Sequence, residues 1–309
     1  MNLSKKAFMH PEDVAALEQL KSIPMFPSAV KAFMKICNER LIHGISMAQK
    51  IRLGPEQLPE IYQYLPPICE TLGIEEPEFY LEMNPQPNAY TMGDTQCFIT
   101  VTSGLVEYLD EDELQAVIAH ECGHILFHHV LYHTMAMLLL QYGSAIFGAL
   151  ATFSAPIRLG LLYWYRRSEL SADRAAAVAL KSPTPVIETM IRLAGGPKSI
   201  TGKINLELYM QQADSYDKLL EGNWDKMLQN FAVMNMQHPF ASVRTREISR
   251  WCDGPEFPKV INALYEQQSA LSCPQCGKLV QADWKFCGRC GHPNPAVKLT
   301  NQQEVTSNE

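Results

Sequence analysis

The chain has 309 residues, 47% of them hydrophobic, which is enough to bury one sizeable core and a small additional module. Its formal net charge of −7 argues against general nucleic-acid binding, so we expect no nucleic-acid partner. The 9 cysteines include a group with metal-ligand spacing beside others without an obvious pairing, which favours a reducing compartment.

Helices dominate the predicted structure of the first 72 residues. One begins at His10 and reaches about Lys21, a second runs from about 28 to 43 after a proline-containing break, and a third from about 56 to 72. We expect this N-terminal segment, 1–72, to pack on the domain that follows. The first residues lack a continuous apolar core, so no secretory signal is predicted. The expected location is the cytoplasm or the cytoplasmic face of a membrane.

Short strands are predicted between about residues 78 and 102, and a long helix follows them. The first turn of this helix carries three acidic residues, 111–113, which suit the positive end of the helix dipole. Apolar residues then recur at helical spacing, namely Leu114, Val117, Ile118, Ile125 and Leu126. The chain is therefore expected to be α+β and mainly helical.

The pentapeptide His120-Glu121-Cys122-Gly123-His124 lies within this helix. On an α-helix, His120 and His124 are one turn apart on the same face, so both imidazoles can reach one zinc ion. Glu121 sits beside them, where it can take a proton from the attacking water. Cys122 points away from the histidine face and is interpreted as a packing residue. The apolar surroundings favour a zinc peptidase over a chance motif on an exposed helix.

A catalytic zinc normally has three protein ligands and an open position, so a third ligand must come from elsewhere. The best candidate is Glu169, which is predicted to begin an alanine-rich helix reaching Leu180. Asp173 lies one turn further along the same face, where it can accept the second ring N–H of a ligand histidine. His128 competes for the ligand role, but three imidazoles along two turns of a straight helix cannot converge on one tetrahedral centre. Three histidines are instead assigned to the helix surface or to support behind the ligands: His128, His129 and His133.

An uncharged stretch, residues 134–157, is long enough to span a bilayer. A single crossing would place the HExxH histidines and Glu169 on opposite sides of the membrane, where they could not share one zinc ion. We therefore expect an apolar helical hairpin near 131–165 that packs in the core or dips into a membrane surface. Trp164 and Tyr165, ahead of two arginines, would suit an interfacial anchor in the second case.

Two pairs of cysteines near the C-terminus form a second pattern with metal-ligand spacing. They follow C-x2-C-x10-C-x2-C, with a glycine after each pair for a tight turn, and comprise Cys273, Cys276, Cys287 and Cys290. Four thiolates at this spacing predict a closed structural zinc site, a zinc ribbon over 268–294, with disulfides as the alternative. Metal binding would supply the folding energy of so short a segment. Residues 295–309 are expected to be a disordered tail.

Further short motifs frame the HExxH helix. Residues 88–92 read Asn-Ala-Tyr-Thr-Met, and His238-Pro239 precedes Arg244. Taken in order with HExxH and Glu-x-x-x-Asp, they resemble the HtpX-like and CAAX-prenyl-endopeptidase family, family forty-eight of the metallopeptidases, in the gluzincin group. The resemblance covers about 70–250. It implies a zincin-type metallopeptidase domain with a small mixed β-sheet, here 73–267, ahead of the ribbon.

The resemblance also implies roles for individual residues. Glu121 would be the general base, His238 would help to stabilise the oxyanion, and Arg244 would organise the site. Without the resemblance, His238 is equally compatible with a histidine at a helix start ahead of a proline. Cys122 stands where the family usually has a small or aliphatic residue, and would make the enzyme sensitive to thiol reagents. The implied cofactors are one structural Zn²⁺ in the ribbon and one catalytic Zn²⁺. The ligands of the catalytic ion would be His120, His124 and Glu169.

Two functions of different classes are compatible with these features. The first is a zinc metalloendopeptidase acting on unfolded, misfolded or membrane-associated proteins, with the substrate pairing as an extra strand along Asn88, Ala89 and Tyr90. The second is an inactive docking or chaperone-like protein that keeps the zincin fold and uses the ribbon and the hairpin as docking surfaces. Glu121 favours the peptidase, because a scaffold needs no general base. A prenyl-peptide protease lacks support, since the sequence does not show the multiple spans of those relatives.

Overall fold

A computed structural model of the chain describes residues 5–36, 39–137, 154–219, 240–270, 272–277, 280 and 284–294. By its contacts the chain divides into two compact units. The larger is Phe8–Asp253, and the smaller combines Met1–Ala7 with Gly254–Glu309. The larger unit therefore ends ahead of the domain limit expected at residue 267. The tail expected over 295–309 lies outside the described residues.

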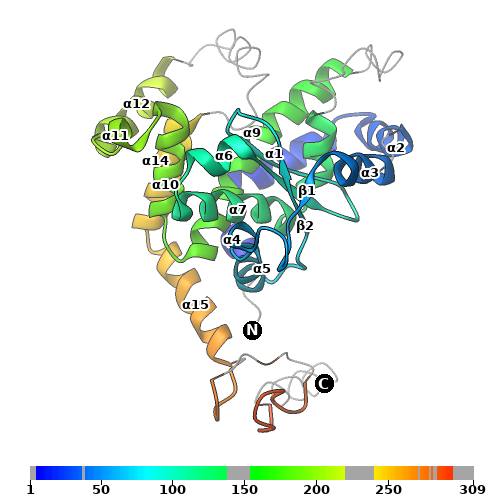
Figure 1. The fold of residues 1–309 in the computed structure, drawn as a ribbon. Helices are drawn as coiled ribbons and strands as arrows, with labels where there is room; N and C mark the ends of the chain where they lie inside the picture. Colours follow the sequence, from blue (N-terminus) through cyan, green and yellow to red (C-terminus); the bar gives the residue numbers. More distant parts are fainter. Residues whose placement is uncertain are drawn as a thin grey trace, which may run out of the picture. The chain divides into compact units, whose positions relative to one another are not determined.

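A four-stranded mixed sheet forms one layer of the larger unit (Figure 1). Its strands are β1 (Ile51–Arg52), β2 (Glu78–Glu82), β3 (Ala89–Met92) and β4 (Phe98–Thr102). The order is β1-β2-β4-β3, with β2 and β4 parallel and the other two pairs antiparallel. Every residue of β4 is buried, as its β-branched and aromatic sequence favours, whereas β3 is an edge strand. The expected α+β class with a small mixed sheet is confirmed, and only the short β1 was not predicted.

The N-terminal part is helical, as predicted, but with more breaks. Its helices are α1 (Pro11–Ser22), α2 (Phe26–Ile36), α3 (Glu39–Gln49), α4 (Pro59–Tyr62) and α5 (Leu65–Leu72). The helix expected over 28–43 is replaced by α2 and α3, and the one expected over 56–72 by α4 and α5. A Pro-Pro pair stands in the first turn of α5, where proline can open a helix but cannot continue one from α4.

The site-bearing helices follow the sheet. They are α6 (Ser103–Tyr108), α7 (Glu111–Leu126), α9 (Ser154–Leu180), α10 (Thr184–Gly195), α11 (Lys198–Thr201), α12 (Leu206–Leu219) and α14 (Ala241–Asp253). α7 packs on α9, while α1 lies against α9 and α10 against α7. Figure 1 shows α10, α12 and α14 on one side of α7, and α2 and α3 on the other. The smaller unit contains a 3-10 turn, Lys5–Ala7, and α15 (Glu256–Ala270).

The expectation that a helix begins at Glu169 is wrong, because α9 starts at Ser154 and holds Glu169 well inside it. The apolar residues ahead of Glu169 continue the same helix, since the described part of α9 buries them against α1. Glu169 is thereby fixed on a continuous helix instead of a fraying first turn.

The uncharged stretch is described only at its two flanks, since 138–153 lie outside the described residues. Both flanks, 130–137 and the start of α9, are helical and join α1 and α2 in one core cluster. Trp164 is 0% exposed and Tyr165 is 7% exposed, so their interpretation as an interfacial anchor is wrong. Among the helices that the structure describes, none has the length and apolar character needed to cross a membrane. The cluster consists of Ala16, Leu20, Phe26, Phe33, Met135, Ala136, Ile157, Leu161, Trp164 and Tyr165.

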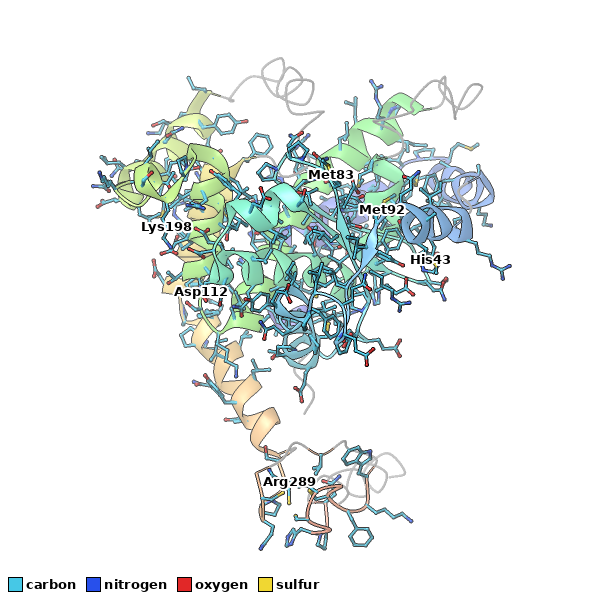
Figure 2. The ribbon with its side chains drawn as sticks, in the orientation of Figure 1. His43, Met83, Met92, Asp112, Lys198 and Arg289 are labelled. Atoms are coloured by element: carbon cyan, nitrogen blue, oxygen red, sulfur yellow. The ribbon has the colours of Figure 1, made fainter. Side chains whose placement is uncertain are left out.

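Asp110 caps the helix that carries the HExxH motif. Its side chain accepts a hydrogen bond from the backbone N–H of Glu113 at 3.1 Å, and Glu113 Oε2 accepts from the backbone N–H of Asp110 at 3.0 Å. This reciprocal pair is a capping box, which satisfies two donors that a helix start leaves without partners. Lys198 Nζ donates to Asp110 Oδ2 at 2.6 Å. Figure 2 labels Lys198 and also Asp112, which stands in the first turn of α7.

We expect Asp110→Ala to lower the free energy of unfolding by about 1 kcal/mol, because it removes the cap of α7. Burial alone would raise the pKa of Asp110, but the hydrogen bonds from Lys198 and from the Glu113 backbone hold that pKa below its usual value. The stabilisation is therefore present at neutral pH and is lost as the pH falls through the lowered pKa. Urea unfolding at neutral and strongly acidic pH measures both effects. The control is Asp112→Ala, in the same turn but outside the box, and an equal loss there would contradict the prediction.

Candidate metal centre

Two histidines of α7 and one glutamate of α9 meet in a buried cluster. His120 Nε2 and His124 Nε2 are 3.2 Å apart. Glu169 Oε2 lies 3.4 Å from His120 Nε2, and Glu169 Oε1 lies 3.4 Å from His124 Nε2. Ligands around a tetrahedral zinc, with bonds of about 2.0–2.1 Å, are separated by about 3.3 Å. The two imidazole nitrogens and the carboxylate therefore fit Zn²⁺ in both donor type and spacing.

Close contact between α7 and α9 brings the glutamate to the histidines. A Cβ at Gly123 would lie 2.8 Å from Ala175 Cβ and 3.0 Å from Ala172 Cα, so only glycine fits there without a shift. Ala172 and Ala175 are both 0% exposed. The glycine within HExxH and the alanines of α9 therefore allow α7 and α9 to approach closely enough to share a site.

Asp173 and Arg244 support His120 from behind. Asp173 Oδ1 lies 2.9 Å from His120 Nδ1, while Arg244 of α14 donates from Nε and Nη2 to the two Asp173 oxygens at 2.8 and 2.6 Å. Arg244 Nη1 also lies 3.1 Å from Glu169 Oε2. Burial opposes the charged forms, yet Arg244 and His120 lower the pKa of Asp173. The arginine therefore balances two buried carboxylates.

The two histidines differ in their electrostatics. Burial opposes the protonation of His120, but hydrogen bonds to Asp173 and Glu169 raise its pKa to about 9. Burial, with His120 beside it, lowers the pKa of His124 to about 4. The carboxylates thus favour a cation on the His120 side of the cluster, while His124 keeps a neutral imidazole at neutral pH.

The helix ends soon after the motif, and this decides the roles of the later histidines. His128 has a left-handed backbone, with φ of 58°, and is exposed. The straight row of three histidines is therefore broken, and His128 cannot join the cluster. His129 and His133 turn inward and are 0% and 6% exposed, so of the two expected placements the helix surface is wrong for both, whereas support behind a ligand histidine agrees with the position of His129. His129 Nδ1 lies 3.1 Å from His124 Nδ1, and His133 Nε2 lies 2.7 Å from Ser168 Oγ.

Glu121 faces the edge strand β3. Thr91 Oγ1 donates to Glu121 Oε2 at 2.5 Å, and both residues are buried. A hydroxyl donor fixes the direction of the carboxylate beside the histidine cluster. Thr91 belongs to the strand motif at 88–92 but was not predicted to contact Glu121.

A pocket opens beside His120 and Glu121, between β3, α7 and α10. Asn88 and Ala89 line it, whereas Tyr90 does not. Tyr90 Oη instead donates to Glu82 Oε2 and accepts from Lys50 Nζ, because successive side chains of a strand point to opposite faces. The pocket is mostly apolar, and its aliphatic lining comprises Leu105, Ala116, Val117, Val186, Met190 and Leu193.

Two expected features have different outcomes. His238 lies outside the described residues, so its role as an oxyanion partner stays a prediction. Cys122 is 0% exposed, and burial raises the pKa of its thiol. The expected sensitivity of Cys122 to thiol reagents is therefore not supported, since neither the thiolate nor access is available.

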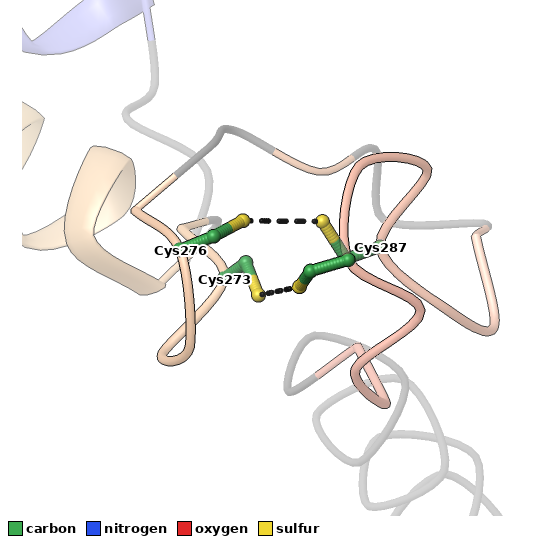
Figure 3. A group of neighbouring side chains, drawn as sticks. Cys273, Cys276 and Cys287 are labelled. Carbon is green, nitrogen blue, oxygen red and sulfur yellow. Dashed lines mark hydrogen bonds between the residues drawn. The ribbon is translucent and has the colours of Figure 1, made fainter.

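The four cysteines of the C-terminal motif converge in the smaller unit (Figure 3). Cys273 Sγ lies 3.5 Å from Cys290 Sγ, and Cys276 Sγ lies 3.6 Å from Cys287 Sγ. Tetrahedral Zn–S bonds of about 2.3 Å place sulfurs about 3.8 Å apart, so the group fits a zinc ion. Gly277 and Gly291 follow the two pairs with φ of 69° and 70°, which allows the tight turn after each pair. All four are free cysteines, so the disulfide alternative is not found.

Comparison with known families finds a matching family model for each of the two parts of the chain. The family model described as Peptidase family M48 matches residues 56–252. A second model, for a zinc-ribbon domain, matches residues 269–294. The first match contains all residues of the buried cluster, and the second contains the four cysteines.

Individual relatives agree with these matches. The chain is 31% identical to the plastoglobule-localized metallopeptidase 48, chloroplastic, of Arabidopsis thaliana over 264 residues, which cover 84% of this chain and 76% of the relative. It is 28% identical to a protease HtpX homolog of Pelotomaculum thermopropionicum, over 49% of this chain and 53% of the relative. A homolog from Aquifex aeolicus is 29% identical, over 48% and 50%. The chain thus spans about half the length of these HtpX homologs. No solved structure matches it.

Proposed function

Because the chain belongs to peptidase family M48 and is a metallopeptidase, we propose that it is a zinc-dependent endopeptidase for unfolded, misfolded or membrane-associated proteins. The observation that carries this proposal is the buried set of His120, His124 and Glu169 with Glu121 beside it. The four clustered cysteines would hold a second, structural zinc. The proposed location is the cytoplasm or the cytoplasmic face of a membrane.

Each residue of the site has a defined task in the proposed reaction. Zinc held by the three donors would polarise the scissile carbonyl and lower the pKa of the attacking water towards about 7. Glu121, oriented by Thr91, accepts the proton of that water and returns it to the leaving amine. Asp173 and Arg244 hold the ring of His120. His238 completes the proposal as a partner of the oxyanion.

The substrate would lie along β3, whose outer edge has no neighbouring strand within the described sheet. An extended peptide can add to such an edge by main-chain hydrogen bonds, so the backbone of residues 88–92 would guide it past Glu121. The pocket beside Glu121 would then take a substrate side chain. Its aliphatic lining favours an apolar side chain, and unfolded proteins expose such residues.

Cleavage assays with the full chain test the proposal. The zinc-loaded protein should cut an unfolded test protein, lose this activity when a chelator removes the metal, and regain it when zinc is added back. Leu193→Glu should lower kcat/KM for peptides with an apolar residue at the cut by about fivefold, the equivalent of about 1 kcal/mol of lost apolar contact. Leu193 lines the pocket and is 45% exposed, so the change need not unfold the protein.

The matched control is Ile200→Glu, since Ile200 is 64% exposed and is not among the pocket residues. Equal effects of the two variants would refute the role of the pocket. No cleavage by the zinc-loaded protein under any condition would refute the peptidase and favour the inactive docking or chaperone-like protein.

A further inference from the structure

A chain of buried polar groups runs from the N-terminal helix α1 to the metal-binding cluster. His124 Nδ1 lies 3.1 Å from His129 Nδ1, and His129 Nε2 lies 3.0 Å from Asp13 Oδ2. Asp13 and His129 are both 0% exposed. Asp13 stands in the first turn of α1, which precedes the region matched by the M48 family model.

Other contacts fix the carboxylate of Asp13. Ser171 Oγ donates to Asp13 Oδ2 at 2.6 Å, and Trp164 Nε1 donates to Asp13 Oδ1 at 3.0 Å. Both partners belong to α9, the helix that supplies Glu169. Burial would raise the pKa of Asp13, but His129, Ser171 and Trp164 together lower it. Asp13 is therefore a fixed negative charge at neutral pH.

The same geometry relates the ring protons of the two histidines. A zinc ion bound through His124 Nε2, the nitrogen that faces His120 and Glu169, would leave the N–H of His124 on Nδ1. His129 Nδ1, 3.1 Å away, would then accept that N–H, and the N–H of His129 would stand on Nε2, beside the Asp13 carboxylate. A carboxylate accepts hydrogen bonds and does not donate them, so Asp13 favours this arrangement of protons over its reverse.

We propose that Asp13 and His129 are positioning residues for the metal site, which hold His124 in the tautomer that binds zinc, so that helix α1 sets the affinity of the site. This rests on the proposed zinc site. It mirrors the support that Asp173 gives His120, and leaves each ligand histidine with its own partner behind the ring. Groups behind metal ligands commonly change metal affinity by about 10–100-fold when they are altered.

The test measures metal affinity in the full chain. Metal-free protein is titrated with Co²⁺ against a chelator, because thiolate ligands give the ribbon site charge-transfer bands that a His-His-Glu site lacks. Asp13→Asn removes the charge that faces His129 and keeps one oxygen, which can accept from Trp164 or from Ser171 but not from both, since they donate to different oxygens of Asp13. We expect it to weaken binding at the His-His-Glu site by about tenfold or more, and His129→Gln to do the same. The affinity of the ribbon in the same sample should not change.

The control is Leu20→Ala, which loosens the packing of α1 but leaves Asp13 and His129 in place, since Leu20 is a core residue at 1% exposure. Thermal unfolding verifies that each variant is folded. Wild-type affinity in Asp13→Asn and His129→Gln would overturn the inference, and so would an equal loss in Leu20→Ala. A wild-type protein that binds Co²⁺ only at the ribbon would instead overturn the proposed zinc site itself.

Discussion

Replacing Glu121 with glutamine should reduce kcat for peptide cleavage by about 10²–10⁴-fold while the zinc content stays unchanged. Glutamine has nearly the shape of glutamate, and its amide oxygen can still accept from Thr91 Oγ1. It cannot accept the proton of the attacking water, so the loss isolates the role of the general base. The three donors to the metal are separate residues and remain in place.

Steady-state kinetics and zinc analysis of the same preparations measure this prediction. The control is Glu111→Gln, an exposed residue in the first turn of the same helix, which should leave kcat unchanged. Cleavage by Glu121→Gln at the wild-type rate would show that the base is another group or that the activity is a contaminant. A loss of zinc together with activity would assign Glu121 a structural role instead.

Local spacing was sufficient to predict much of the site. His120 and His124 are one helical turn apart, as are Glu169 and Asp173, and helix geometry alone places each pair on one face. The cysteine pairs are local in the same sense, since a short knuckle with a following glycine needs no distant partner. These residues meet where the sequence predicted, although α9 starts earlier than expected and carries Glu169 in its interior.

Contacts between distant segments could not be predicted in this way. Asp13 and His129 lie far apart in the sequence, and no periodicity in either segment indicates that they meet. Thr91 reaches Glu121 because β3 lies at the sheet edge beside α7. The inward turn of His129 depends on the left-handed backbone at His128. The helical pattern of the motif gives no indication that the helix ends before His128.

Substitution of Arg244 is expected to have a large effect on stability, because its charge is balanced against buried carboxylates. Its guanidinium contacts both Asp173 and Glu169, and its side chain is only 9% exposed. Arg244→Met would keep much of the volume but leave two buried carboxylates without that cation. Breaking a buried pair by removing one partner costs about 3–5 kcal/mol. We therefore expect a loss of this size in the free energy of unfolding of the metal-free protein, measured by urea denaturation.

The metal should offset part of this loss, because a divalent cation beside Glu169 replaces the charge that the arginine supplied. Arg244→Met should therefore be less destabilising in the zinc-loaded protein than in the metal-free protein, and the difference measures the coupling between Arg244 and the metal. Arg250→Met on the same helix is the control, since Arg250 is 60% exposed in its pair with Asp214 and a surface pair contributes about 0–1 kcal/mol. If both variants lost equally little stability, Arg244 would not be balancing the buried carboxylates. If the loss at Arg244 were the same with and without zinc, the arginine and the metal would not share Glu169.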